Sequence, residues 1–337
     1  MSIRVGYFPH NNSLFVLRHR GIVERLLPEV EWVDLRALPH SPRVDPKTAL
    51  PSEHSDWLFI EGGYDIIGTG FTPPLTALAN QRDIVYLGIS GPRVENGRLV
   101  ATAASGITSA ADLKGKRVGI AHGSWQTTLL LFALDQAGLS WADVDPVDVD
   151  VRVGGTALLA GELDAWVGTY PGLQDVEAAT ELTTLVDTAS VFSHPSLWFT
   201  RRDLADGNRA AVEAVLAALQ ESDAWIAANP RAAAQYFVDD AQSRDIPADL
   251  DAWEAALRGR PFGVRAVSED FLDEQQRAAD LLAANGLLPR AVDVRSAVLP
   301  WIGEVISETS PAPSEPAKLG VIELITPSVE FTRAATP

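Results

Sequence analysis

The feature that most limits the possible folds is the stretch from Asp112 to Leu139, DLKGKRVGIAHGSWQTTLLLFALDQAGL. Its short apolar segment at 118–120 predicts a buried strand, and the apolar run at 129–134 predicts a helix. Ser124 is suited to cap that helix, because its hydroxyl can accept a hydrogen bond from a free N–H of the first turn. A strand, a Gly-Ser turn and a helix N-terminus direct several N–H groups to one place, which predicts an anion site.

The same alternation of strand and helix recurs along most of the chain. Strands are expected near 3–7, 30–35, 64–68, 84–89 and 98–103, then at 118–120, 148–153 and 164–168, with a returning strand at 197–200. This pattern predicts an α/β fold with two lobes, each a mostly parallel sheet flanked by helices. We expect the first lobe to comprise residues 1–102 and 201–301, and the second 103–200. Residues 302–337 read as a Pro- and Ser-rich extension that packs loosely.

Three segments in a fixed order resemble a known family. They are the strand Ile3 to Tyr7, then DLKGKRVGIAHGS at 112–124, then GELDAWVGTYPGL at 161–173. Over about residues 3–301 the chain is similar to the solute-binding proteins of aliphatic-sulfonate, taurine and nitrate ABC importers. The resemblance implies the two-lobed fold of type II periplasmic binding proteins, a sulfonate-like organic anion bound between the lobes, and an ABC permease as partner.

Composition excludes several classes of function. A formal net charge of −18 over 337 residues opposes binding to nucleic acid or to an anionic membrane surface. The absence of cysteine excludes disulfides, thiolate metal sites and a cysteine nucleophile. The sequence contains no run of roughly 18 apolar residues, so we expect no membrane span. We expect a monomer without a cofactor.

The start of the sequence bears on where the protein acts. Met1-Ser2 leads directly into the first predicted strand, with no apolar segment of the kind that an export signal contains. As written, the chain is expected in the cytoplasm. It is expected in the periplasm or outside the cell if the true start lies upstream.

Polar loops at the carboxyl ends of four predicted strands should face the space between the lobes, where ligands of open α/β sheets bind. Their neutral donors suit an anion, and their aromatic rings suit a carbon skeleton. Any one of these residues can be explained as a helix cap or a core side chain, but together they favour a pocket. The candidate ligand-binding residues are His10, Asn11, Asn12, Ser13, Thr69, Gly70, Phe71, Thr72, His122, Gly123, Ser124, Trp125, Thr169 and Tyr170.

Catalysis is the alternative hypothesis. The resemblance extends to two groups of cytosolic enzymes on the same fold, the aryl-sulfinate desulfinases and the thiamine-pyrimidine synthases. The desulfinases' nucleophilic cysteine falls near His10, and their histidine falls at His54, which makes these two the candidate catalytic residues. This chain lacks that cysteine and the synthases' cysteine-rich motif. Binding without turnover is therefore preferred over a desulfinase-like enzyme that uses other chemistry.

The histidines also raise the question of a metal. None of the six histidines forms an i, i+4 pair beside a carboxylate, so no metal site is expected. A site built from His10, His54 and His122 would require the fold to bring them together, and separate hydrogen-bonding roles are preferred.

Overall fold

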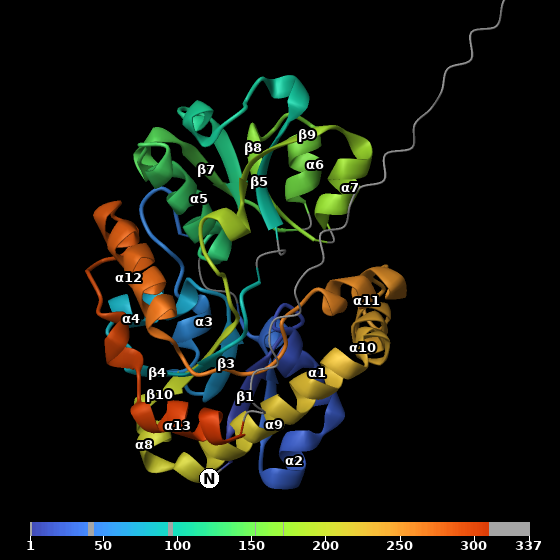
Figure 1. The fold of residues 1–337 in the computed structure, drawn as a ribbon, viewed down its shortest axis with the longest axis vertical. Coiled ribbons are helices and arrows are strands. Elements are labelled where there is room, and N and C mark those ends of the chain that lie inside the picture. The colour runs from blue at the N-terminus through green and yellow to red at the C-terminus, as the bar shows by residue number, and fades with distance from the viewer. Residues whose placement is uncertain (1, 40–43, 94–96, 152, 171, 310–337) are drawn as a thin grey trace, which may run out of the picture.

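The computed structural model describes residues 2–39, 44–93, 97–151, 153–170 and 172–309 (Figure 1). They form two five-stranded sheets, each with helices packed on its faces, stacked as two lobes along the long axis of the molecule. The predicted two-lobed α/β fold is therefore confirmed.

The first sheet has the strand order β2-β1-β3-β10-β4. β10 runs antiparallel to both of its neighbours, whereas β1 runs parallel to β2 and β3. The strands are β1 (Arg4–Tyr7), β2 (Glu31–Asp34), β3 (Ile66–Thr69), β4 (Ile84–Ile89) and β10 (Leu197–Arg201).

The second sheet repeats this plan with the order β7-β6-β8-β5-β9. Here β5 is the reversed strand, antiparallel to β8 and β9, and β6 runs parallel to β7 and β8. Both sheets are thus mixed, with one reversed strand each. The strands are β5 (Gly97–Thr102), β6 (Arg117–Ile120), β7 (Asp145–Asp148), β8 (Ala165–Thr169) and β9 (Leu182–Asp187).

Most helices belong to the first lobe. These are α1 (Asn12–Arg20), α2 (Ile22–Leu26), α3 (Glu53–Asp56), α4 (Pro73–Ala79), α8 (Arg202–Gly207), α9 (Arg209–Ala228), α10 (Pro230–Gln242), α11 (Leu250–Arg258), α12 (Glu269–Ala284) and α13 (Pro300–Thr309). The second lobe carries α5 (Trp125–Gln136), α6 (Gly154–Leu159) and α7 (Gly172–Ala179). Short 3-10 turns lie at η1 (Leu35–Ala37), η2 (Ala103–Ser105), η3 (Ala110–Leu113), η4 (Trp141–Asp143), η5 (Thr188–Ser190) and η6 (Val294–Ala297).

The expected lobe boundaries need correction. β5 lies in the second sheet, so the first crossing falls between β4 and β5 and not near Thr102. β10 lies in the first sheet, so the second crossing is at about 188–196 and not at Thr200. In both cases a strand pairs with partners distant in sequence, and local patterning carries no information about that pairing.

The two crossing segments are hydrogen-bonded to each other. The Ser90 N–H donates to the Ser196 carbonyl at 2.9 Å, and the Ser196 N–H donates to the Ser90 hydroxyl at 2.9 Å. The Arg93 N–H donates to the Ser193 carbonyl at 2.9 Å, and its guanidinium donates to the Ser196 hydroxyl at 3.1 Å. The two segments that connect the lobes are therefore hydrogen-bonded to each other.

Helix boundaries follow local sequence closely. Asn208 and Ser268 cap α9 and α12 through their side chains. The amphipathic pattern of 14–27 predicts one helix, but the structure has two, because Gly21 adopts φ +61° between them. Residues 52–60 also read as one helix in the sequence, but the structure has only the single turn of α3 there.

The C-terminal end of the described chain also differs from expectation. α13 occupies 300–309, and its Ile302, Val305 and Ile306 are buried in the core of the first lobe. Part of the predicted loose extension at 302–337 is therefore packed helix. The remainder lies outside the described residues.

One hydrophobic core continues from lobe to lobe. Phe71 and Phe271 of the first lobe share a cluster of buried side chains with Leu130 and Val167 of the second. α12 contacts α5 of the second lobe (Figure 1). The Arg277 guanidinium lies 4.6 Å from the centre of the Phe132 ring. The lobes are joined by packing as well as by the two crossings.

Candidate functional site

The four predicted loops follow the carboxyl ends of β1, β3, β6 and β8. Two of them meet across the lobe junction. The Thr72 hydroxyl donates to the Ser124 carbonyl at 2.9 Å and lies 2.8 Å from the Thr128 hydroxyl. Gly70 lies against Trp125, since a Cβ built on Gly70 would be 3.7 Å from the Trp125 Cβ. The site proposed from sequence therefore has its centre where the β3–α4 loop contacts the start of α5.

The N–H groups at the start of α5 are already engaged. Gly123 N–H donates to the Thr127 hydroxyl at 2.9 Å, and Ser124 N–H donates to the Ala121 carbonyl at 3.2 Å. The Ser124 hydroxyl accepts from Gln126 N–H at 3.1 Å, which confirms the predicted cap. The Gly123, Ser124 and Gln126 N–H groups are thus used within the protein.

Trp125 contacts a residue that the sequence analysis did not select. The His194 ring stacks on the Trp125 ring with centroids 4.3 Å apart, and Phe192 lies 5.4 Å from His194. His194 is 1% exposed, and burial lowers the pKa of its ring well below the usual value, with repulsion from Arg93 and Arg260 acting in the same direction. This histidine is therefore neutral. In the sequence, only the following Pro195 marks this position, and in the structure His194 adopts the unusual φ of +43°.

Trp125 also reaches the second sheet. A Cβ built on Gly97 at the start of β5 would lie 3.1 Å from the Trp125 Cη2 atom. The half-buried indole thus contacts a loop of one lobe, a strand of the other and the crossing segment between them. Trp125 therefore packs the lobe junction, and the exposed part of its ring remains available to contact a ligand.

The loop after β1 turns toward its own lobe. The Asn11 side chain caps α1 by accepting from Leu14 N–H at 3.0 Å, and the Asn12 amide donates to the Pro9 carbonyl at 2.8 Å. Only His10 is exposed in this loop, with its ring 5.6 Å from that of Phe8.

Ser13 bonds a buried carboxyl. Its hydroxyl donates to Asp223 Oδ2 at 3.0 Å, and the Gly263 N–H donates to the same oxygen at 2.9 Å. Burial raises the pKa of Asp223 to about 7 despite these two bonds. Asp223 thereby connects α1, α9 and the segment after α11, and sequence reasoning had not singled it out.

Tyr170, the residue after β8, is bonded to the side chain of Arg98. The Tyr170 hydroxyl accepts from the Arg98 guanidinium at 2.7 Å and donates to Glu177 Oε1 at 3.2 Å. Arg98 also forms an ion pair with Glu177 and donates to the Thr184 hydroxyl at 3.0 Å. Thr169 precedes this group at the end of β8. Arg98, near the start of β5 and beside the end of β8, is a candidate cation that sequence reasoning missed, because its strand was assigned to the other lobe.

The remaining candidates are placed less favourably for ligand contact. Phe71 is fully buried and packs edge-on against Phe192 and Phe271, so it belongs to the core. The Thr69 hydroxyl donates to the Gly70 carbonyl at 2.9 Å. His54 lies in α3, and its side chain is outside the described ones.

His122 bonds a proline-rich segment of the other lobe. Its Nε2 lies 2.6 Å from the Ala49 carbonyl, and burial lowers the pKa of the ring. Across the described ranges, no group of three or more His, Asp or Glu side chains is placed to hold a metal ion.

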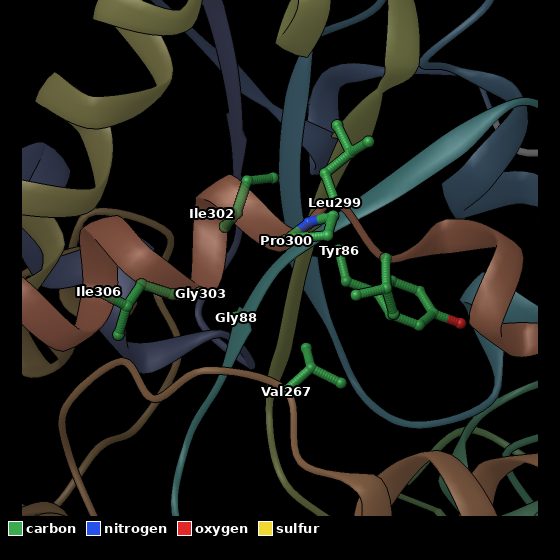
Figure 2. A pocket seen from close by; sticks show the side chains of 9 residues that line it. Tyr86, Gly88, Val267, Leu299, Pro300, Ile302, Gly303 and Ile306 are labelled. Atoms are coloured by element: carbon green, nitrogen blue, oxygen red, sulfur yellow. The ribbon is translucent and has the colours of Figure 1, made fainter.

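Two cavities lie elsewhere in the first lobe. Figure 2 shows one of about 150 Å³, where β4 meets α13. Its lining residues are Tyr86, Gly88, Val267, Val298, Leu299, Pro300, Ile302, Gly303 and Ile306. The second, of about 480 Å³, lies where β1 and β3 begin and is lined in part by Arg4, Asp65 and Arg201. Neither cavity is lined by a residue of the strand-end loops.

Two lobes with the same strand order, two crossings and loops meeting between them define the class of type II periplasmic binding proteins. The resemblance read from the sequence is confirmed by comparison. The sequence pattern of the NMT1/THI5-like family matches residues 75–233. This chain is 27% identical, over 88% of its own length and 88% of the relative's, to an aliphatic sulfonates-binding protein of Escherichia coli (strain K12).

Solved structures agree with this placement. The alkanesulfonate-binding protein SsuA from Xanthomonas axonopodis pv. citri, bound to MOPS, superposes with a TM-score of 0.71 at 26% identity, covering 88% of this chain and 98% of that one. The desulfurization enzyme DSZB superposes with a TM-score of 0.60 at 17% identity, covering 92% and 99%. The second likeness is one of fold alone.

Along the described part of the chain, no helix combines the length and the apolar character needed to cross a membrane.

Proposed function

We propose that this chain is a solute-binding protein that holds a small sulfonate-like anion between its lobes and delivers it to an ABC permease. The observation that carries the proposal is the similarity to a sulfonates-binding protein along nearly the whole two-lobed chain. The convergence of the β3–α4 loop and the start of α5 supports an interlobe site.

Hydrogen bonds within the protein reduce the number of donors that are available to the anion. Because the Gly123 and Gln126 N–H groups are engaged, we assign most of the contacts to side chains. His10 is exposed, Tyr170 and Trp125 are half-buried, and Arg98 provides a cation beside Tyr170. We assign the carbon skeleton of the ligand to Trp125 and its charged head to the Tyr170–Arg98 end, where the anion would replace Glu177 as the partner of Arg98.

The test is thermal unfolding in the presence of a panel of anions. Ethanesulfonate, MOPS, benzenesulfinate, acetate and nitrate are added separately to the purified protein. A ligand bound only by the native state adds RT ln(1 + [L]/Kd) to stability, so a sulfonate should raise the melting temperature. Tyr170→Ala should reduce that rise. The absence of any rise across the panel would contradict the proposal.

Turnover is tested on the same protein. The relatives with 26–27% identity are named as binding proteins, whereas the desulfurization enzyme shares only the fold. We expect no sulfite release from aryl sulfinates. If release occurs, His10→Asn should lower its rate about 10²–10⁴-fold if His10 transfers a proton. Release by the wild type would establish the desulfinase-like alternative.

The proposed permease partner implies that the protein acts outside the cytoplasmic membrane. Fractionation of cells that express the gene from its natural start tests this directly. Recovery in the cytosol alone would favour the enzymatic alternative.

A further inference from the structure

We propose that residues 44–51, which we call the strap, latch the two lobes together along one side, so that the lobes separate only along the opposite side. The strap leaves the first lobe between η1 and α3 and extends over the start of α5 in the second lobe. The proposal concerns lobe motion and is independent of which ligand is bound.

The front half of the strap bonds the region between α5 and β7. The Trp141 indole N–H donates to the Pro46 carbonyl at 2.9 Å, and Trp141 itself is 2% exposed. Lys47 Nζ lies 2.6 Å from Asp145 Oδ1 at the start of β7. A buried donor and an exposed ion pair thus hold the same short segment to the second lobe.

The back half of the strap covers the loop before α5. The Ala49 carbonyl is bonded by His122 Nε2 at 2.6 Å. Pro51 lies so close to Gly123 that a Cβ there would be 2.4 Å from the Pro51 Cγ atom. Gly123 also has φ +79°, so both its conformation and its contact with the strap depend on the absence of a side chain.

The strap is anchored in the first lobe as well. The Leu50 N–H donates to the Leu287 carbonyl at 3.2 Å just beyond α12, and the Leu50 side chain joins the shared core. Nearby, the Asn285 side chain accepts from Trp141 N–H at 2.9 Å, and Arg277 pairs with Asp135 at 3.1 Å. Opening on this side would break bonds that cross the junction.

The opposite side of the junction is bonded differently. Tyr170, Arg98 and Glu177 bond one another within the second lobe. Ser13 and Gly263 bond Asp223 within the first lobe. Separation of the lobes on this side leaves these bonds intact. The crossing segments and the strap therefore act as the pivot, and the free edge lies near α7 and α11.

The absence of cysteine in the natural chain makes a distance measurement straightforward. Ala178 on α7 and Ala255 on α11 are exposed and are replaced together by cysteine to carry spin labels. Pulsed electron resonance then gives the distribution of distances across the free edge. It is recorded for the otherwise wild-type chain and for a strap variant, Lys47→Ala with Trp141→Phe.

A matched control makes the same two kinds of change inside single lobes. Lys114→Ala removes the ion pair with Asp143 within the second lobe, at 3.0 Å. Trp32→Phe removes the indole donor to Glu24 within the first lobe, at 2.9 Å. The control variant should keep the wild-type distribution.

The strap variant should increase the population of longer distances about fivefold or more, the factor that corresponds to one ordinary hydrogen bond. If it does not keep the wild-type melting profile, Lys47→Ala alone is used, since its side chain is 57% exposed and its loss should give about a twofold increase. Equal distributions in the strap and wild-type chains, or equal broadening in the control, would overturn the proposal.

Discussion

The two sides of the lobe junction use similar loops at the ends of parallel strands, but their bonds run in different directions. On the strap side, side chains such as Trp141 and His122 bond the main chain of the other lobe. On the free side, Tyr170 and Ser13 bond partners within their own lobes. The position of a loop at a strand end does not by itself make it a ligand contact. What its polar groups already bond decides whether they are available to a ligand.

The two sides should also respond to pH in opposite directions. The free side depends on a buried carboxyl, Asp223, whose pKa is raised by burial. The strap side depends on a histidine, His122, whose pKa is lowered by burial. Raising the pH should therefore destabilise the free side, and lowering the pH should destabilise the strap side.

The largest effect is expected for Asp223→Asn. Burial raises the pKa of Asp223 from 3.8 to about 7, so the unfolded state releases this proton first as the pH rises. Stability is fully present below about pH 4 and falls until about pH 7, by an amount of the order of 4 kcal/mol at about 1.4 kcal/mol per pKa unit. The variant should flatten this slope in chemical unfolding between pH 4 and 8. A slope unchanged from wild type would show that the carboxyl is hydrated.

Gly123→Ala should be the next most severe change. The new Cβ meets Pro51 at 2.4 Å and forces a left-handed conformation, which should cost about 2–3 kcal/mol of unfolding free energy. Gly106→Ala is the control, because Gly106 has φ +74° with no atom within 4 Å of a built Cβ. The control isolates backbone strain of about 1 kcal/mol. If urea unfolding gives the same loss of unfolding free energy for both variants, Pro51 moves aside without an energetic penalty.

Tyr170→Phe should cost about 1 kcal/mol, the net value of one ordinary hydrogen bond, because it removes the hydroxyl shared by Arg98 and Glu177. Since these bonds stay within one lobe, the label distances between 178 and 255 should not change. A broadened distribution would show that the free side is also latched.

The smallest effect is expected for His122→Gln at acid pH. Burial lowers the pKa of His122, whereas the Ala49 carbonyl and the carboxylates of Asp148 and Asp45 act in the opposite direction. The unfolded state takes up this proton first, so stability present above about pH 6.5 is lost as the pH falls below it. The variant should lose less stability than wild type between pH 6.5 and 5. Melting temperatures at these two values provide the check.

Local features were predictable where a residue acts on its own turn. Ser124, Asn208 and Ser268 cap helices because a short polar side chain reaches an N–H two or three residues ahead. Gly138 has φ +70° just after α5 for an equally local reason. The resemblance to a known family supplied the two-lobed fold.

What sequence could not supply was contact between distant segments. Pro46 and Pro51 lie in a proline-rich segment without a helix or strand pattern, and nothing nearby in the sequence indicates that Pro51 packs against Gly123. Arg98 was assigned to the wrong lobe, so its bond to Tyr170 was missed. The engagement of the α5 N–H groups likewise depends on how the whole loop folds, which spacing alone does not reveal.

The reversed strand of the first sheet has a consequence for how the protein is made. β10 separates β3 from β4, yet the ribosome synthesises it only after every strand of the second sheet. The second sheet is one continuous stretch of chain and can assemble as soon as it emerges. The first sheet cannot be completed until β10 has been synthesised, because β10 pairs with both β3 and β4. The order of synthesis thus makes the inserted lobe the first to be completed and the lobe that begins the chain the last.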